Sequence, residues 1–232
     1  MEGPRYAIYF VPAEEGALYR FGSSWLGYDC YSGTALSRPP VPGLTAEDAD
    51  QLTREPRTYG FHGTLKAPFH LDLAFGEEEL LAAIETVGAA GRPIPAFEPA
   101  VELLESFVAI VPASPCAALD KLAADCVRYF DRFRAPLSEK DRQRRPASGL
   151  IARQRENLEA WGYPYVFEDF RFHMTLTGRV PKETRRSVLD ALQDAFAHAY
   201  GGKSVPVDRV ALLIQDREGQ PFRVLRNVLL KP

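Results

Sequence analysis

A five-residue string occurs twice in this chain, and the repetition constrains the fold more than any other feature of the sequence. Phe-His-Gly-Thr-Leu at 61–65 and Phe-His-Met-Thr-Leu at 172–176 differ only at the middle position. Each string is followed by a segment with helical apolar spacing and then by an apolar hairpin-like segment, and Ile94 and Val205 lie at the same distance beyond the two histidines. Shared order and spacing favour an internal duplication over coincidence.

The elements expected after each string follow from apolar periodicity. Residues 77–90 and 182–200 carry apolar side chains at helical spacing and end before glycines. The runs that follow them are short, apolar and separated by turn residues, which predicts two β-hairpins. These runs are 100–104 with 107–111, and 205–214 with 222–230.

Three further elements are expected outside the duplicated segments. Residues 5–11 predict a first strand, and 116–133 predict a helix. Thr45 and Asp48 have the spacing of a helix capping pair, so a short helix should begin there and end before Pro56.

Composition sets the class of protein. The 232 residues are 46% apolar and 25% charged, which is typical of a globular chain, and the net charge of -3 gives no general sign of nucleic-acid binding. The three cysteines have no metal-ligand spacing and are interpreted as reduced thiols. No segment resembles a secretion signal or a membrane span, so we expect a soluble cytoplasmic protein.

Strand alternation predicts where the polar side chains of the two strings point. If each string lies on a strand, its polar residues face one side and its apolar residues the other. The polar sets are His62, Thr64 and Lys66 in the first copy, and Arg171, His173, Thr175 and Thr177 in the second. Two lobes related by an approximate twofold axis would bring these faces together across a cleft.

Such a cleft suits the chemistry of a phosphodiester. One neutral imidazole can take a proton from attacking water while the other, protonated, gives one to the leaving oxygen. The two threonine hydroxyls can donate to the nonbridging phosphate oxygens, and Lys66 or Arg171 could offset the charge there. Tyr59 is a further candidate substrate contact. These steps need no metal or cofactor, and none is expected.

The paired His-x-Thr motifs resemble those of the two-histidine phosphoesterase superfamily. The resemblance implies that His62 and His173 are the acid/base pair and that Thr64 and Thr175 bind phosphate. It also implies lobes that pack helices on antiparallel sheets around a central groove. The longer strings at 59–66 and 161–178 resemble an uncharacterised bacterial branch whose members are often encoded beside phosphonate-utilisation genes. The motifs are specific for the superfamily and not for a substrate.

We therefore predict an α+β fold built as a bilobal, pseudo-twofold duplication with a central active-site cleft. Residues 1–232 would form a single bilobal domain, with 1–113 as the approximate N-terminal lobe and 114–232 as the C-terminal lobe. Residues 138–161 are interpreted as an insertion that could form a wall over the cleft. Trp161, the final residue of the insertion, and the two tyrosines after it, Tyr163 and Tyr165, either stack on a base or ribose or anchor the insertion, and anchoring is favoured.

The predicted activity is metal-independent hydrolysis of a small sugar or nucleotide cyclic phosphate, with phosphonate catabolism as the suggested setting. One alternative is an enzyme that processes RNA 2′,3′-cyclic or 2′,5′-linked ends, against which the net acidity counts mildly. Another is a phospho-ligand or RNA binding module without turnover. A small phosphorylated substrate is the expected partner, and no membrane partner is expected. The sequence leaves open which histidine is the base and what the oligomeric state is.

Overall fold

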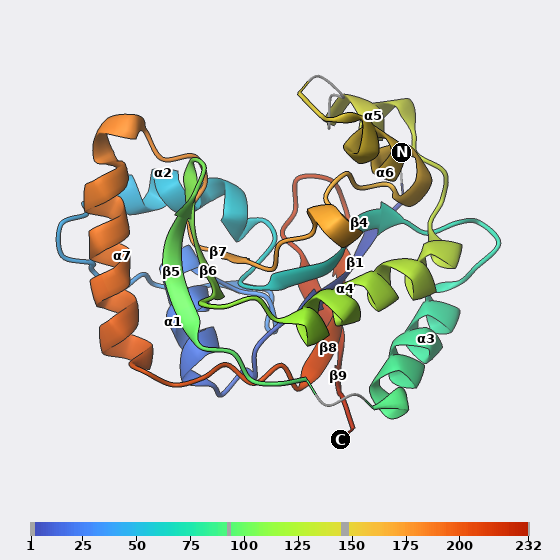
Figure 1. Cartoon of the computed structure of the whole chain (residues 1–232), viewed down its shortest axis with the longest axis horizontal. Coiled ribbons are helices and arrows are strands. Elements are labelled where there is room, and N and C mark those ends of the chain that lie inside the picture. Colours follow the sequence, from blue (N-terminus) through green and yellow to red (C-terminus); the bar gives the residue numbers. More distant parts are fainter. Residues whose placement is uncertain (1–2, 92–93, 145–148, 232) are drawn as a thin grey trace.

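The computed structural model describes residues 3–91, 94–144 and 149–231 and has an α+β fold, as predicted (Figure 1). Its main sheet is antiparallel and seven-stranded in the order β5-β6-β7-β4-β1-β8-β9. These strands are β1 (Arg5–Phe10), β4 (Gly63–His70), β5 (Pro99–Leu104), β6 (Phe107–Pro112), β7 (Met174–Thr175), β8 (Arg209–Gln215) and β9 (Arg223–Leu229). The short strands β2 (Tyr28–Asp29) and β3 (Thr34–Ala35) form a separate pair.

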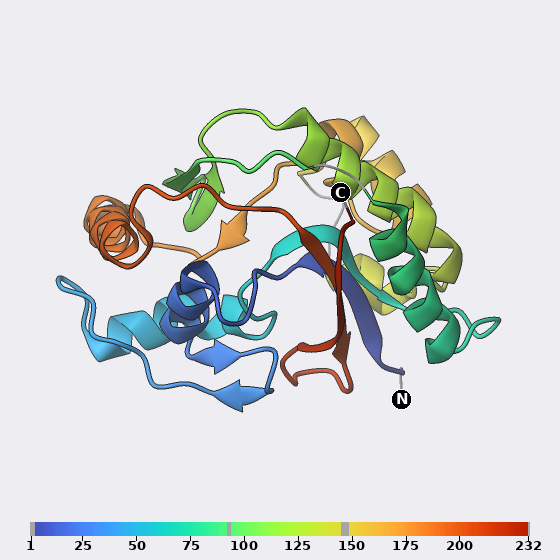
Figure 2. The same ribbon diagram turned by 90° about the horizontal axis from the view of Figure 1, so that it is seen from below.

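The helices lie in two groups at opposite ends of the molecule (Figures 1 and 2). Helices α3 (Glu77–Ala90) and α4 (Ala117–Phe130) pack on the β4-β1-β8-β9 side of the sheet. At the other end, α7 (Arg185–Tyr200) packs on β5 and on α1 (Ala17–Leu26), which in turn contacts α2 (Ala46–Arg57). Short 3-10 turns lie at η1 (Asp131–Phe133), η2 (Phe167–Asp169) and η3 (Lys182–Thr184). The predicted helices and hairpins after each motif are thus present.

The two motif strands, β4 and β7, are neighbours at the centre of the sheet, but the hairpins that follow them are exchanged. Hairpin β5-β6 follows the first motif in the chain and pairs with β7, the strand of the second motif. Hairpin β8-β9 follows the second motif and pairs with β1, which pairs with β4. The sheet pairing therefore crosses the predicted boundary near residue 113, and the division into lobes there stays a prediction.

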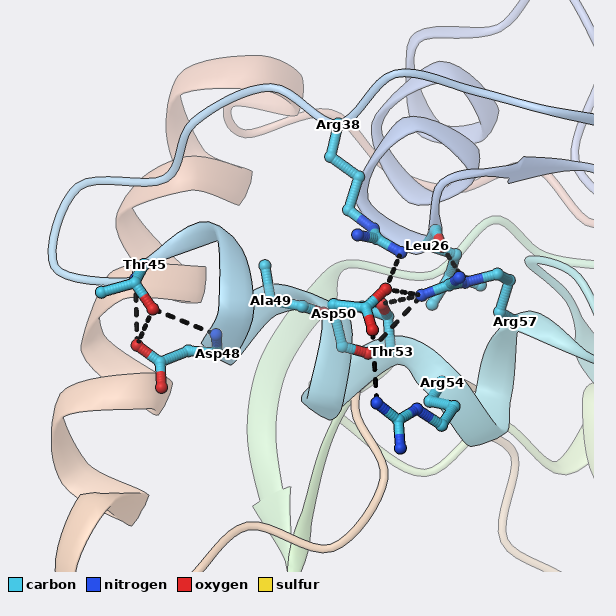
Figure 3. Close-up of polar contacts among 9 residues, drawn as sticks. All are labelled: Leu26, Arg38, Thr45, Asp48, Ala49, Asp50, Thr53, Arg54 and Arg57. Atoms are coloured by element: carbon cyan, nitrogen blue, oxygen red, sulfur yellow. Dashed lines mark hydrogen bonds and ion pairs between the residues drawn. The ribbon is translucent and has the colours of Figure 1, made fainter.

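Helix α2 begins as predicted but does not end where predicted. Thr45 and Asp48 form a reciprocal capping box at its start (Figure 3). The helix continues through Pro56, although proline lacks the N–H that would bond the carbonyl four residues earlier. That carbonyl, of Leu52, instead accepts the N–H of Gly178 at 2.6 Å. A distant segment thus offsets the missing helical bond, which is why the predicted end before Pro56 is wrong.

An ion-pair cluster on α2 fastens this helix to α1 (Figure 3). Asp50 accepts hydrogen bonds from Arg57, Arg38 and Arg54, and the Arg57 bond is the largest cause that lowers the pKa of Asp50 to about 2. Arg57 also donates from Nε to the carbonyl of Leu26 at the end of α1. The cluster holds the C-terminal end of α2, from which the chain leads directly into the first motif.

The predicted insertion contains two helices, α5 (Glu139–Arg144) and α6 (Ala152–Trp161), and residues 145–148 lie outside the described residues. Arg142 pairs with Glu159 between the two helices. Lys140 pairs with Glu218 at the β8-β9 turn, which fastens the insertion to the main sheet. The insertion is therefore tied to the body of the protein through charged contacts.

No helix in the described part of the chain is long and apolar enough to cross a membrane. The cytoplasmic location stays a prediction.

Candidate active site

The two His-x-Thr motifs meet where β4 and β7 pair. The paired residues are Gly63 and Met174, the middle residues of the two motifs. Counting outward in this antiparallel register, His62 comes opposite Thr175, and Thr64 comes opposite His173. All four polar residues share the face away from Gly63 and Met174, so the duplication in the sequence becomes a near-twofold arrangement of two imidazoles and two hydroxyls.

The opposite face of this strand pair is closed by packing. A Cβ atom on Gly63 would lie only 2.4 Å from the ring of Phe172, which is itself buried. Any larger residue at position 63 would push that ring away or displace the strand. Glycine at the middle of the first motif therefore lets the two motif strands lie together while the core remains filled.

A cavity of about 430 Å³ opens on the polar face, a volume suited to a small ligand. His62, Thr64, Thr175 and Tyr59, all predicted site residues, line it. The other lining residues come from several parts of the chain and are Tyr9, Glu55, Pro56, Gly60, Ala67, Pro68, Ser106, Phe107, Tyr163, Thr177, Gly178 and Arg179. His173 is half-buried beside the lining, with its ring centroid 5.5 Å from that of Phe107.

The two imidazoles are held by the same hydrogen bond. Nδ1 of His62 lies 2.9 Å from the carbonyl oxygen of Gly60, and Nδ1 of His173 lies 2.8 Å from that of Arg171. A carbonyl oxygen can only accept, so Nδ1 carries the hydrogen in both rings, and Nε2 of the neutral ring is an acceptor. Both side chains are thus fixed in the tautomer that a general base needs.

His62 has two further contacts that fix its ring. Nε2 lies 3.1 Å from the hydroxyl oxygen of Thr64, which donates to it because Nδ1 already holds the ring hydrogen. The ring also stacks on buried Tyr9, with centroids 3.7 Å apart. Among the described residues no hydrogen bond joins His173 and Thr175, so the His62–Thr64 hydrogen bond has no counterpart in the second motif.

Gly60, which holds His62 through its carbonyl, is itself tightly constrained. Its φ of 71° lies in the left-handed region that favours glycine. A Cβ at this position would lie 2.7 Å from the Cβ of buried Cys30. Backbone conformation and packing both require glycine here, and they fix the carbonyl that orients the imidazole.

Burial lowers the pKa of both histidines. The pKa of His62 falls to about 4, mainly because burial disfavours the charged ring, and a positive charge on His173 lowers it further. The Gly60 carbonyl acts in the opposite direction. The pKa of His173 is also lowered, again mainly by burial. Both rings are therefore neutral near pH 7, and an anionic ligand would favour protonation.

Lys66 does not lie where strand alternation predicts. It is 2% exposed, and its Nζ pairs with Asp131 at 2.9 Å instead of facing the cavity. Consecutive residues of β1 pair with Thr64 and then with Lys66, so Leu65 is an extra residue and the strand bulges there. The bulge breaks the alternation after Thr64 and turns Lys66 toward α4. The predicted position on the polar face is wrong.

Arg171 also lies outside the cavity lining. Its exposed side chain pairs with Glu102 of β5 at 3.2 Å. Its contact with the site is through the backbone carbonyl that holds His173. Tyr59, in contrast, lines the cavity as predicted, and its ring stacks on Phe222 with centroids 5.6 Å apart.

Several lining residues were missed by the sequence argument. Tyr9, Glu55, Phe107 and Arg179 come from segments whose approach to the motifs depends on the sheet order and on α2. Arg179 follows the second motif closely, and that proximity was the available signal. Tyr163, for which anchoring was favoured, lines the cavity, whereas Trp161 packs edge-on against Phe167.

No group of three histidine, cysteine, aspartate or glutamate side chains within 3–91, 94–144 and 149–231 is placed to hold a metal ion. The predicted independence of metals stays a prediction.

Paired His-x-Thr motifs on adjacent central strands define a site of the two-histidine type. The chain belongs to the DUF1045 family, described as a protein of unknown function, whose model matches residues 64–223. The match includes His173 and begins just after His62.

Two curated relatives bear the name "Ribose 1,5-bisphosphate phosphokinase PhnN". The protein of Janthinobacterium sp. (strain Marseille) is 38% identical over 221 residues, covering 94% of this chain and 49% of the relative. The protein of Laribacter hongkongensis (strain HLHK9) is 33% identical over 226 residues, covering 97% of this chain and 52% of the relative. The chain thus spans about half the length of these relatives.

Solved structures of low sequence identity are also similar. A conserved protein of unknown function from Agrobacterium tumefaciens str. C58 has a TM-score of 0.48 at 14% identity, covering 100% of this chain and 87% of that one. A structure named only as a phosphoesterase has a TM-score of 0.42 at 14% identity, and E. coli LigT complexed with NADP+ has 0.42 at 15%. Each of these two covers 100% of both chains. The chemistry proposed below rests on the residues of the site itself.

Proposed function

We propose that this protein is a metal-independent phosphoesterase that hydrolyses a cyclic phosphodiester, with His62 and His173 as its acid/base pair. The observation that carries the proposal is the matched setting of the two imidazoles. Both lie at the centre of one sheet face, and both donate from Nδ1 to a backbone carbonyl. Each Nε2 is thereby prepared to accept or return a proton during the reaction.

In the proposed reaction, the phosphate lies between the two motifs. One Nε2 takes a proton from water as the water oxygen bonds to phosphorus, and the protonated Nε2 of the other histidine gives its proton to the leaving oxygen as that P–O bond breaks. The product is a phosphomonoester with a free hydroxyl. Thr64 and Thr175 donate to the nonbridging oxygens, which carry the negative charge of the transition state.

We assign the role of base to His62 and that of acid to His173. The Thr64 hydroxyl lies 3.1 Å from Nε2 of His62 and donates to it when the ring is neutral, which is the form that a base needs. Burial also favours the neutral form, because it disfavours the charged ring. When substrate binds, the Thr64 hydroxyl would turn to a phosphate oxygen, and Nε2 would then be available to the attacking water.

The proposed substrate class is a small sugar cyclic phosphate such as ribose 1,2-cyclic phosphate. The cavity volume of about 430 Å³ suits a small ligand better than a polymer end. Tyr163, which follows the insertion, lines this cavity and restricts it on that side. The two relatives carry a name that refers to a ribose phosphate, which supports a sugar phosphate substrate and a setting in phosphonate metabolism.

The test is turnover of a substrate panel in the presence of EDTA, with products identified by phosphorus NMR. The panel contains ribose 1,2-cyclic phosphate, 2′,3′-cyclic nucleotides and RNA with cyclic ends. We expect wild type to open a small cyclic phosphate and His62→Ala and His173→Ala each to lose that activity. His198→Ala is the matched control, because His198 is an exposed residue of α7 outside this cavity.

Each alternative has a distinct outcome. Turnover of RNA ends in preference to small cyclic phosphates, with a steep salt dependence, would replace the substrate class by RNA. Binding without turnover, retained in His62→Ala, would make the protein a binding module. Activity that disappears in EDTA and returns with added metal would end the proposal of a metal-free mechanism.

A further inference from the structure

Arg179 is a positively charged residue of the cavity lining that forms no ion pair with a described side chain. It is exposed and lines the cavity, and in the described ranges it makes no ion pair within 4.0 Å and no side-chain hydrogen bond. Two other basic residues were predicted to offset the charge of a bound phosphate, but both have ionic partners. Lys66 pairs with Asp131, and Arg171 pairs with Glu102. Arg179 is thus the cation of the described lining that is available to a ligand.

The backbone on both sides of Arg179 is fixed. Gly178 donates its N–H to the carbonyl of Leu52 on α2, and Val180 donates to the carbonyl of Ser106 in the β5-β6 turn, each at 2.6 Å. The residue is therefore held between two separate elements of the cavity wall. Because both of these hydrogen bonds are made by the backbone, the guanidinium can adjust to a ligand while the backbone of Arg179 stays in place.

The position of Arg179 differs from that of the catalytic residues. The catalytic residues lie at the β4-β7 pair, whereas Arg179 is attached to α2 and to the β5-β6 turn. Arg179 therefore comes from a part of the cavity wall other than the β4-β7 pair, where two hydroxyls and two imidazoles already surround the proposed site of the reacting phosphate.

We infer that Arg179 binds a second anionic group of the substrate, a phosphate that does not react. A guanidinium can bind phosphate through two parallel hydrogen bonds, which gives both affinity and orientation. The inference rests on the proposed function and narrows its substrate class to cyclic phosphates that carry an additional phosphate. Glu55, on the last turn of α2 beside Gly178, is the acidic residue of this wall and would oppose the second phosphate.

The test compares two substrates that differ only in the second phosphate, ribose 1,2-cyclic phosphate 5-phosphate and ribose 1,2-cyclic phosphate. For Arg179→Gln we expect kcat/KM to fall about 10- to 100-fold with the first substrate, the usual effect of a charge-assisted hydrogen bond, and to change less than about twofold with the second. With the first substrate, the kcat/KM of Arg179→Lys should lie between those of wild type and Arg179→Gln, because lysine keeps the positive charge but cannot form two parallel hydrogen bonds.

Arg186→Gln is the matched control, since Arg186 is an exposed arginine on α7 that pairs with Asp190 and does not line the cavity. It should leave both substrates unchanged. Glu55→Gln should raise affinity for the doubly phosphorylated substrate, because an opposing charge is removed. An equal fall of kcat/KM with both substrates in Arg179→Gln, or no fall with either substrate, would overturn the inference.

Failure of the proposed function would be a different result, in which wild type turns over neither substrate. Calorimetry with ribose 1,5-bisphosphate and ribose 1-phosphate then tests Arg179 without catalysis. Tighter binding of the bisphosphate by wild type, lost in Arg179→Gln, would uphold the second phosphate site. Equal binding of the two ligands, or no binding of either, would refute it.

Discussion

Replacing Asp131 should destabilise the protein more than replacing its ion-pair partner Lys66, and the structure gives the reason. Asp131 accepts from Lys66 at 2.9 Å and also from Arg134, whose Nε and Nη2 lie 2.8 and 3.2 Å from its two oxygens. Lys66 donates to Asp131 and to the backbone carbonyl of Val127. Asp131 therefore retains an ionic partner when the lysine is lost, whereas the buried lysine loses its carboxylate partner when the aspartate is lost and keeps only the Val127 carbonyl and the ring of Phe69.

The expected magnitudes follow from this difference. Asp131→Asn leaves a buried ammonium without its countercharge, so the free energy of unfolding should fall by about 3–5 kcal/mol. Lys66→Met keeps most of the side-chain volume and leaves Asp131 paired with Arg134, so its effect should be within about 1.5 kcal/mol. Urea denaturation of both variants measures the two values.

Stability in Asp131→Asn should also depend on pH in a defined direction. Burial is the largest cause that lowers the pKa of Lys66, and removal of the aspartate would lower it further. The unfolded chain then binds more protons than the folded one, so the free energy of unfolding should rise as pH increases toward the lysine's ordinary pKa of about 10.4. Equal destabilisation by both variants, or a loss of substrate affinity in folded Lys66→Met, would refute this account of Lys66.

The remaining predictions concern the site. The maximum of kcat/KM should lie below pH 6.5. The base His62 becomes protonated and inactive only as pH falls through its pKa of about 4, whereas the acid His173 loses its proton as pH rises through its lowered pKa. A pH-rate profile checks this, and a maximum above pH 7 would contradict it. Thr64→Val removes a phosphate donor and should lower kcat about 10²- to 10³-fold with the fold intact, as steady-state kinetics and circular dichroism would measure, and unchanged kcat would exclude that role. Gly60→Ala should destabilise the protein by about 1–3 kcal/mol in urea denaturation, because of its positive φ and the Cys30 contact; a loss below about 0.5 kcal/mol would show that the site relaxes.

The sequence predicted the features that depend on local patterns. The helices and hairpins after each motif follow from periodicity, and the pairing of the motifs was visible because the same string occurs twice. The position of Lys66 was not predictable, because the bulge at Leu65 is set by register with β1. Pro56 remained inside α2 because Gly178, far along the chain, supplies the missing hydrogen-bond donor. Each error arose where a partner distant in sequence decides the local structure.

The exchange of hairpins explains why the site could be predicted only in part. Phe107, from the hairpin after the first motif, contacts the ring of His173 in the second motif. Phe222, just before the last strand of the other hairpin, stacks on Tyr59 beside the first motif. Each half of the duplication therefore supplies aromatic contacts to the site residues of the other half. A duplicated motif predicts that two histidines meet, but the surroundings that set their pKa values and shape the cavity come from the sheet order, which no local pattern encodes.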